Sequence, residues 1–141
     1  MHYVQAKSIL TPTSMNIYRG CQHGCIYCDA RSLCYQMDHA FEDIEVKENA
    51  PELLERSLKS GRKARMIGTG SMSDPYIPLE QKLQLTRRCI ELVEKYGYGF
   101  TVLTKSDLVL RDLDLLCRIN EKTKAVVQMT ITTMDDRMCQ I

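Results

Sequence analysis

Short apolar runs along the chain alternate with longer segments in which apolar residues recur every three or four positions. The short runs predict four core strands, at about residues 15–18, 65–68, 100–103 and 125–132, and a further short strand over 44–46. The helical spacing predicts helices over residues 51–59, 79–96 and 111–119. Asp135 and Asp136 are typical of the acidic first turn of another helix.

Strands that alternate with helices predict an α/β fold built from βα units around a parallel sheet. In such folds the chemistry lies where the strands end. Each predicted strand is followed by unusual sequence at that end: a cysteine cluster, the run GTGSMSDP, the run Thr104 to Ser106, and Thr132 with Thr133. This coincidence predicts one shared site.

Composition bounds the class of protein. The chain has 141 residues, is 44% hydrophobic and 26% charged, and carries a net charge of +1. We expect a single domain over residues 1–141, and the near-neutral charge argues weakly against general nucleic-acid binding. The first ten residues hold no signal-peptide-like apolar stretch, and no window approaches the roughly 18 apolar residues of a membrane span. We therefore expect a cytoplasmic protein that does not enter a membrane.

Seven cysteines in a reducing compartment are better explained as metal ligands, buried residues or catalytic groups than as disulfides. Cys21, Cys25 and Cys28 have the spacing C-x3-C-x2-C, and three such thiolates can hold three corners of an iron–sulfur cube while the fourth iron stays open. The alternative is a zinc knuckle at Cys25 and Cys28, completed by His23 or Cys34. A second CxxC pair, which structural zinc sites usually have, is not present in the sequence.

The remaining cysteines have simpler explanations. Cys89 and Cys117 fall within helical apolar patterns and are expected in the core, Cys117 together with Leu113 and Leu116. Cys34 is expected to be a packed or spare thiol, and the sequence suggests no role for Cys139.

The C-x3-C-x2-C spacing, with Tyr27 directly before the third cysteine, resembles the radical S-adenosylmethionine (SAM) superfamily. The resemblance implies a [4Fe–4S] cluster on the three cysteines, with SAM chelating the open iron. An electron from a flavodoxin- or ferredoxin-type donor would cleave SAM to methionine and a 5′-deoxyadenosyl radical, which abstracts hydrogen from substrate. It also implies a partial parallel (β/α) barrel, of which this chain supplies about four βα units.

Longer strings are similar to the branch related to spore photoproduct lyase. They are residues 16–21 (NIYRGC), 28–32 (CDARS), 73–80 (SDPYIPLE) and 104–108 (TKSDL), with Arg111 and Asp112. That enzyme uses a cysteine after the second strand as hydrogen donor, but residues 66–76 contain none, and Ser71 lies in the matching segment. A serine O–H bond is too strong for that step, which argues against thymine-dimer repair as the reaction. A nucleic-acid substrate has only the basic run from Arg56 to Arg65 in its favour, and a solvated helix end and loop is the better explanation of that run.

The resemblance also implies contacts to SAM. Ser71 and Ser73 are candidates for its ammonium group, and Lys105 resembles the family lysine near its carboxylate. Thr130 and Thr132 are two residues apart, so a strand would place both hydroxyls on one face, toward the ribose. Tyr27 would contact the adenine mainly through its backbone. Turn formation, solvent exposure and strand propensity are simpler explanations for the same residues.

The length of the chain bears on three hypotheses about its function. A six-unit barrel at the size of ordinary βα units needs about 190 residues, so the chain is expected to be an apparently truncated, N-terminal part of a radical SAM core. It would then be an enzyme or its cofactor-binding half, whose barrel is completed by a second chain. The other hypotheses are a metal-binding fragment without turnover and a zinc-stabilised structural module.

Overall fold

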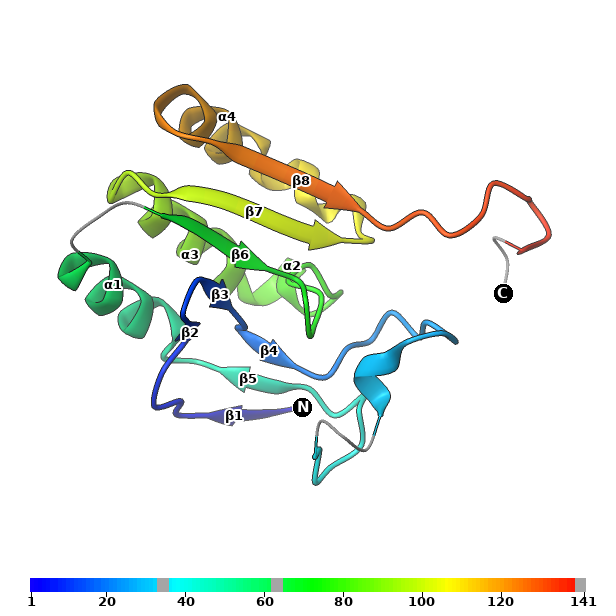
Figure 1. Cartoon of the computed structure of the whole chain (residues 1–141). Helices are drawn as coiled ribbons and strands as arrows, with labels where there is room; N and C mark the ends of the chain where they lie inside the picture. The colour runs from blue at the N-terminus through cyan, green and yellow to red at the C-terminus, as the bar shows by residue number, and fades with distance from the viewer. Residues whose placement is uncertain (33–35, 62–64, 139–141) are drawn as a thin grey trace.

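A five-stranded sheet brings the strand ends of the chain to one edge. The computed structural model describes residues 1–141 apart from 33–35, 62–64 and 139–141. The sheet order is β2-β3-β6-β7-β8. These strands are β2 (Leu10–Thr11), β3 (Ser14–Met15), β6 (Met66–Thr69), β7 (Gly99–Thr104) and β8 (Ala125–Met129). From β3 onward each strand is parallel to the next, so their carboxyl ends meet at one edge, together with the cysteine loop (Figure 1).

A second, three-stranded sheet lies beside the first and has the order β1-β5-β4. Its strands are β1 (His2–Val4), β5 (Glu45–Lys47) and β4 (Tyr18–Arg19), with β1 parallel and β4 antiparallel to β5. The strand predicted over 15–18 is therefore wrong as one element, because β3 and β4 belong to different sheets.

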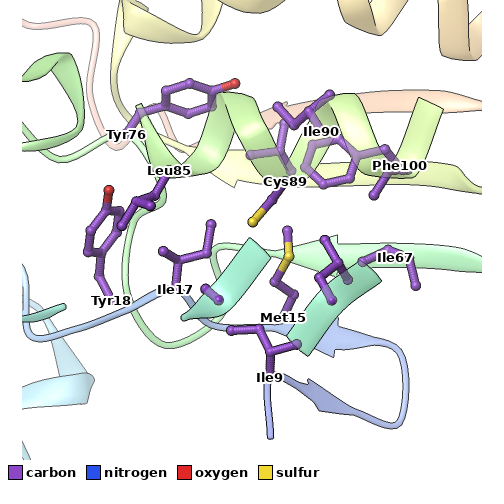
Figure 2. Packing of buried hydrophobic residues seen from close by; sticks show 14 of the residues in the cluster. Ile9, Met15, Ile17, Tyr18, Ile67, Tyr76, Leu85, Cys89, Ile90 and Phe100 are labelled. Atoms are coloured by element: carbon purple, nitrogen blue, oxygen red, sulfur yellow. The ribbon is translucent and has the colours of Figure 1, made fainter. Parts of the chain in front are cut away.

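Three helices form a layer in chain order: α1 (Ala50–Ser60), α3 (Leu85–Lys95) and α4 (Leu113–Lys122). Of these, α3 and α4 pack against the parallel strand β7, α4 also contacts β8, and α1 packs against α3. They confirm the predicted βα rhythm. Cys89 and Ile90 of α3 lie near Phe100 of β7 and Met15 of β3 in the apolar core (Figure 2). The described residues form two sheets rather than a closed barrel, so the barrel stays a prediction. No helix of the described part is long and apolar enough to cross a membrane.

The helix predicted over 79–96 is interrupted at Gln84, whose φ of +54° separates α2 (Glu80–Leu83) from α3. The cause is the buried carboxylate of Glu80. It accepts hydrogen bonds from the backbone amides of Thr86 at 3.1 Å and Arg87 at 3.5 Å, in the first turn of α3. The carboxylate accepts hydrogen bonds from amides that have no partner within the helix, and its negative charge interacts favourably with the positive end of the α3 dipole. A new helix therefore begins at this point.

Three other predictions need correction. In place of a helix from residue 111, a 3₁₀ segment, η3 (Asp107–Asp112), leads into α4, which buries Leu115, Leu116 and Ile119. Cys117 and Leu113 are exposed, because they point away from that face. The strand predicted over 125–132 stops at Met129, since its partner β7 ends at Thr104. The helix predicted from Asp135 extends into residues outside the description.

Glu80 belongs to a buried charged network. Tyr18 donates its hydroxyl hydrogen to Glu80, and Arg111 Nη2 lies 2.7 Å from Glu80 Oε1 and 2.9 Å from Asp112 Oδ2. Tyr76 donates to Asp112 at 2.9 Å, and Arg87 Nη1 approaches the same carboxylate at 2.8 Å. Burial and the charge of Glu80 raise the pKa of Tyr18 far above its usual value, so the phenol stays a donor. The network joins β4, both halves of the interrupted helix and η3.

We predict that Glu80→Gln lowers the free energy of unfolding by about 3 kcal/mol, because a buried arginine loses its countercharge. The amide NH₂ would also face donors on Tyr18 or Thr86. Glu91→Gln, on the exposed side of α3, should cost less than about 0.5 kcal/mol. Urea unfolding of both variants measures the difference, and equal losses would contradict the role of the network.

Candidate metal centre

The cysteine loop is fixed in place at its first residue. Gly20 has a φ of +91°, and a Cβ atom there would lie 2.4 Å from the carbonyl oxygen of Phe41. The amide of Cys21 donates to the same oxygen at 3.1 Å. Ser73 is buried and donates its hydroxyl hydrogen to the carbonyl of Gly20. Glycine is therefore required for the close approach of the loop to the segment that contains Phe41.

All three cysteines of the motif are half-buried and line one pocket. Burial raises the pKa of the Cys21 thiol, and backbone hydrogen bonds from His23 and Asp74 oppose part of this shift. Amide hydrogen bonds of this kind stabilise a metal-bound thiolate and tune the potential of an iron–sulfur cluster. Two backbone amides thus approach the Cys21 sulfur, although burial still disfavours its free thiolate.

The motif allows two kinds of metal centre, a zinc ion and an iron–sulfur cluster. A structural zinc ion takes four protein donors on one atom, whereas in a [4Fe–4S] cube each thiolate binds a different iron and the fourth iron can stay open. Three half-buried cysteines that line one pocket supply the three thiolates that such a cluster needs. The donor set therefore fits a cluster with one open iron.

Asp74 connects the cysteine loop to two strand ends. Its carboxylate accepts hydrogen bonds from Thr104 Oγ1 at 2.7 Å and from the backbone amides of Lys105 at 2.9 Å and Tyr76 at 2.8 Å. His23 Nε2, from the cysteine loop, lies 3.3 Å from Oδ2. Burial opposes ionisation, but the combined hydrogen bonds outweigh it and lower the pKa of Asp74. The residue is an ionised anchor at the centre of the site.

Two adjoining cavities extend from the cysteines along the strand ends, with volumes of about 190 and 630 Å³. Their lining shares His23, Cys25, Tyr27, Lys105 and Thr130. Lys105 Nζ lies 4.4 Å from the centre of the Tyr27 ring, a cation–π distance. A space of this size, with a cation, an aromatic ring and hydroxyls, suits a small polar ligand.

The structure gathers most of the predicted site residues around these cavities. Both cavities are lined by Tyr27, Lys105 and Thr130, and Thr132 lines the larger one. Thr130 and Thr132 lie beyond β8, so they do not share a strand face as predicted. Ser71 is exposed and Ser73 buried, and neither lines the cavities described. Their contacts to SAM stay predictions, and Cys34 and Cys139 lie outside the described residues.

Sequence reasoning did not single out Asp74 and Gly70, and it considered His23 only as a zinc ligand. Gly70 has a φ of +102°, and a Cβ atom there would lie 1.9 Å from the carbonyl oxygen of Leu103. The signal available in the sequence was the position of Asp74 shortly after a strand, where a carboxylate can cap neighbouring loops.

The basic run is separate from the cavities. Of its described members, Arg56 and Lys59 lie in α1 and Arg65 directly precedes β6, at the end of the sheet opposite to the cysteine loop (Figure 1). Lys59 Nζ lies 3.4 Å from Glu55, an ordinary helix ion pair. Arg62 and Lys63 lie outside the described residues.

Comparison with known proteins identifies a family for this chain. Residues 15–141 match the model of the radical SAM superfamily. The chain is similar to an uncharacterized protein of Methanocaldococcus jannaschii, 38% identical over 121 residues, which cover 79% of this chain and 45% of that protein. An uncharacterized protein of Mycobacterium tuberculosis is 28% identical over 131 residues, covering 89% of this chain and 38% of that protein.

An uncharacterized protein of Acidianus two-tailed virus is 25% identical over 138 residues, covering 91% of this chain and 44% of that protein. The chain therefore spans less than half the length of these curated relatives. No solved structure matches the chain.

We predict that Gly20→Ala destabilises the protein by at least about 2 kcal/mol and lowers iron uptake, because positive-φ strain adds to the clash with Phe41. Gly24→Ala is the matched control: Gly24 also has a positive φ of +68°, but nothing lies within 4 Å of its Cβ position. It should cost only about 1 kcal/mol. Urea unfolding and iron analysis after reconstitution give the comparison, and equal effects would contradict the packing argument.

Proposed function

Because the chain belongs to the radical SAM superfamily, we propose that it is the part of a radical SAM enzyme that holds a [4Fe–4S] cluster and SAM. Cys21, Cys25 and Cys28 are the proposed cluster ligands. The observation that carries the proposal is the meeting of these cysteines with Lys105 and Thr130, from two other strand ends, around one cavity. When bound, cluster and SAM supply an electron and a 5′-deoxyadenosyl radical that abstracts hydrogen from substrate.

Lys105 is the proposed partner of the SAM carboxylate. Its backbone is held by Asp74 and its ammonium group stands over Tyr27, at the wall that both cavities share. A lysine restrained in this way offers charge to an anionic ligand with less loss of entropy than a free surface lysine. Thr130, whose amide approaches the carbonyl of Thr104 at 3.3 Å, and Thr132 offer hydroxyls for the ribose.

A flavodoxin- or ferredoxin-type protein is the proposed electron donor. The cysteine loop lies at the surface, with the side chains of Ile26 and Tyr27 exposed. Exposed apolar residues beside a redox centre suit the small, transient interfaces of electron-transfer partners.

The residues around the cavities limit which substrates can be proposed. The strings that resemble the spore photoproduct lyase branch support an enzyme of related architecture. The segment from Gly70 to Asp74 offers no thiol, and the described members of the basic run lie at the end of the sheet opposite to the cysteine loop. We therefore propose a reaction other than thymine-dimer repair.

Completion of the barrel is part of the proposal. In the described part of the chain β8 pairs with β7 alone, and Val127, Met129 and Leu113 are exposed around it. An open strand edge with apolar neighbours favours further strand pairing. Further polypeptide, either in the same protein or in a second chain, would supply the remaining strands and most contacts to substrate.

Anaerobic reconstitution with iron and sulfide tests the cluster. We expect about four irons per chain and a broad absorbance near roughly 400 nm that dithionite bleaches. Cys21→Ala, Cys25→Ala and Cys28→Ala should each lose it, whereas Cys117→Ala, at an exposed cysteine of α4, should not. One colourless zinc ion per chain, bound through the same three cysteines, would overturn the proposal.

SAM binding to the reconstituted protein tests the pocket. We expect Lys105→Ala to weaken SAM binding about tenfold, or 1.4 kcal/mol, through loss of a charge-assisted contact. Lys95→Ala is the control, because Lys95 also stands over a tyrosine, 5.3 Å from the Tyr96 ring centre, but far from the cavities. Equilibrium dialysis measures affinity. Release of 5′-deoxyadenosine after dithionite reduction separates an active enzyme from a fragment that only binds the cluster.

A further inference from the structure

A second group of ligand-type side chains lies in the three-stranded sheet, apart from the cysteine cavities. It consists of His2 on β1, Glu45 on β5 and His39 from the segment before β5. His2 and Glu45 are paired in register on neighbouring parallel strands. One donor atom of each residue lies within 4.8 Å of the others, and the two imidazole rings are perpendicular with centres 4.8 Å apart.

His39 is held in one tautomer. Its Nδ1 lies 3.0 Å from the carbonyl oxygen of Ala40, which can only accept, so Nδ1 carries the hydrogen. In the neutral ring Nε2 is then an acceptor. This atom is buried without a hydrogen-bond partner and lies 3.9 Å from Glu45 Oε2. A buried acceptor nitrogen that faces a carboxylate oxygen is unfavourable unless a cation lies between them.

The surrounding charges favour a cation. Asp38 lies 3.9 Å from His39 Nε2, and Asp43 lies 3.1 Å from His2 Nδ1. Two positive groups oppose them: Arg19 Nη1 lies 3.9 Å from Glu45 Oε2, and the ammonium group of Met1 lies 2.7 Å from Asp43 Oδ1. The attraction of Arg19 for Glu45 is only partial at that distance, so the carboxylates of Glu45 and Asp38 can still favour a cation beside His39.

We propose that His2, His39 and Glu45 bind a divalent transition-metal ion, with zinc as the best match. Two imidazole nitrogens and one carboxylate oxygen form a common zinc donor set, whose fourth position is taken by water. Ligand bonds of about 2.0–2.1 Å place the donor atoms roughly 3.3–3.5 Å apart, so the side chains close by about 1 Å on binding.

The metal would have a structural consequence for the cysteine loop. It joins β1 and β5 to the segment that carries His39, and two residues later Phe41 accepts the hydrogen bond of Cys21. Zinc at this position would hold the support against which Gly20 packs. The site shares no residue with the proposed iron–sulfur centre, so zinc binding to it can be tested in the absence of the cluster.

Zinc titration by isothermal calorimetry tests the site, using the tag-free full chain with Cys21, Cys25 and Cys28 all replaced by serine. These changes remove the competing thiolates. We expect one zinc ion per chain and a higher thermal midpoint with zinc. His39→Gln in this background should weaken binding at least tenfold and abolish the thermal shift. His23→Gln, at a second histidine beside a carboxylate, should retain both.

His2→Gln gives an independent measurement on the edge strand, and far-UV circular dichroism establishes that each variant is folded. It should lose zinc as His39→Gln does. Absence of zinc binding in the cysteine-free background would overturn the proposal. Unchanged binding in both His39→Gln and His2→Gln would also overturn it.

Discussion

The carboxylate of Asp74 is the contact on which the candidate site depends. It receives the hydroxyl of Thr104 and the amides of Lys105 and Tyr76, and it stands beside His23 of the cysteine loop. One ionised group thus sets the relative positions of the cysteines and the carboxyl ends of β6 and β7. A buried carboxylate is costly unless its hydrogen bonds are made, so these segments are restrained together.

Behind the site, two further carboxylates restrain the segment that follows Asp74. Glu80 and Asp112 are fully buried and are paired with Arg87 and Arg111. Such a network is a weak source of net stability, but it penalises any arrangement that leaves one charge unpaired. It therefore specifies how the 74–80 segment, α3 and η3 meet. The fold places its polar interactions where the chain turns from strand to helix, next to the cavities.

The apolar pattern was sufficient for the βα rhythm, because helices and strands that bury one face must repeat at 3.6 or 2 residues. It could not find the interruption at Gln84. The apolar spacing continues across that residue, and the cause is a contact of Glu80 with amides six and seven positions later. It also could not separate β3 from β4, since residues 15–18 are equally apolar whether they lie in one sheet or two.

The sequence by itself predicted the ligand set, because three cysteines at a short fixed spacing are close together in the chain. It also indicated Tyr27 and Lys105, each at a defined place relative to a strand end. Only the tertiary structure decided what surrounds them. Asp74 meets Thr104 across 30 residues, and His2 meets Glu45 across 43, through sheet register that leaves no local pattern in the chain. The physical reason is that a buried polar group is defined by its partners, which folding alone brings within reach.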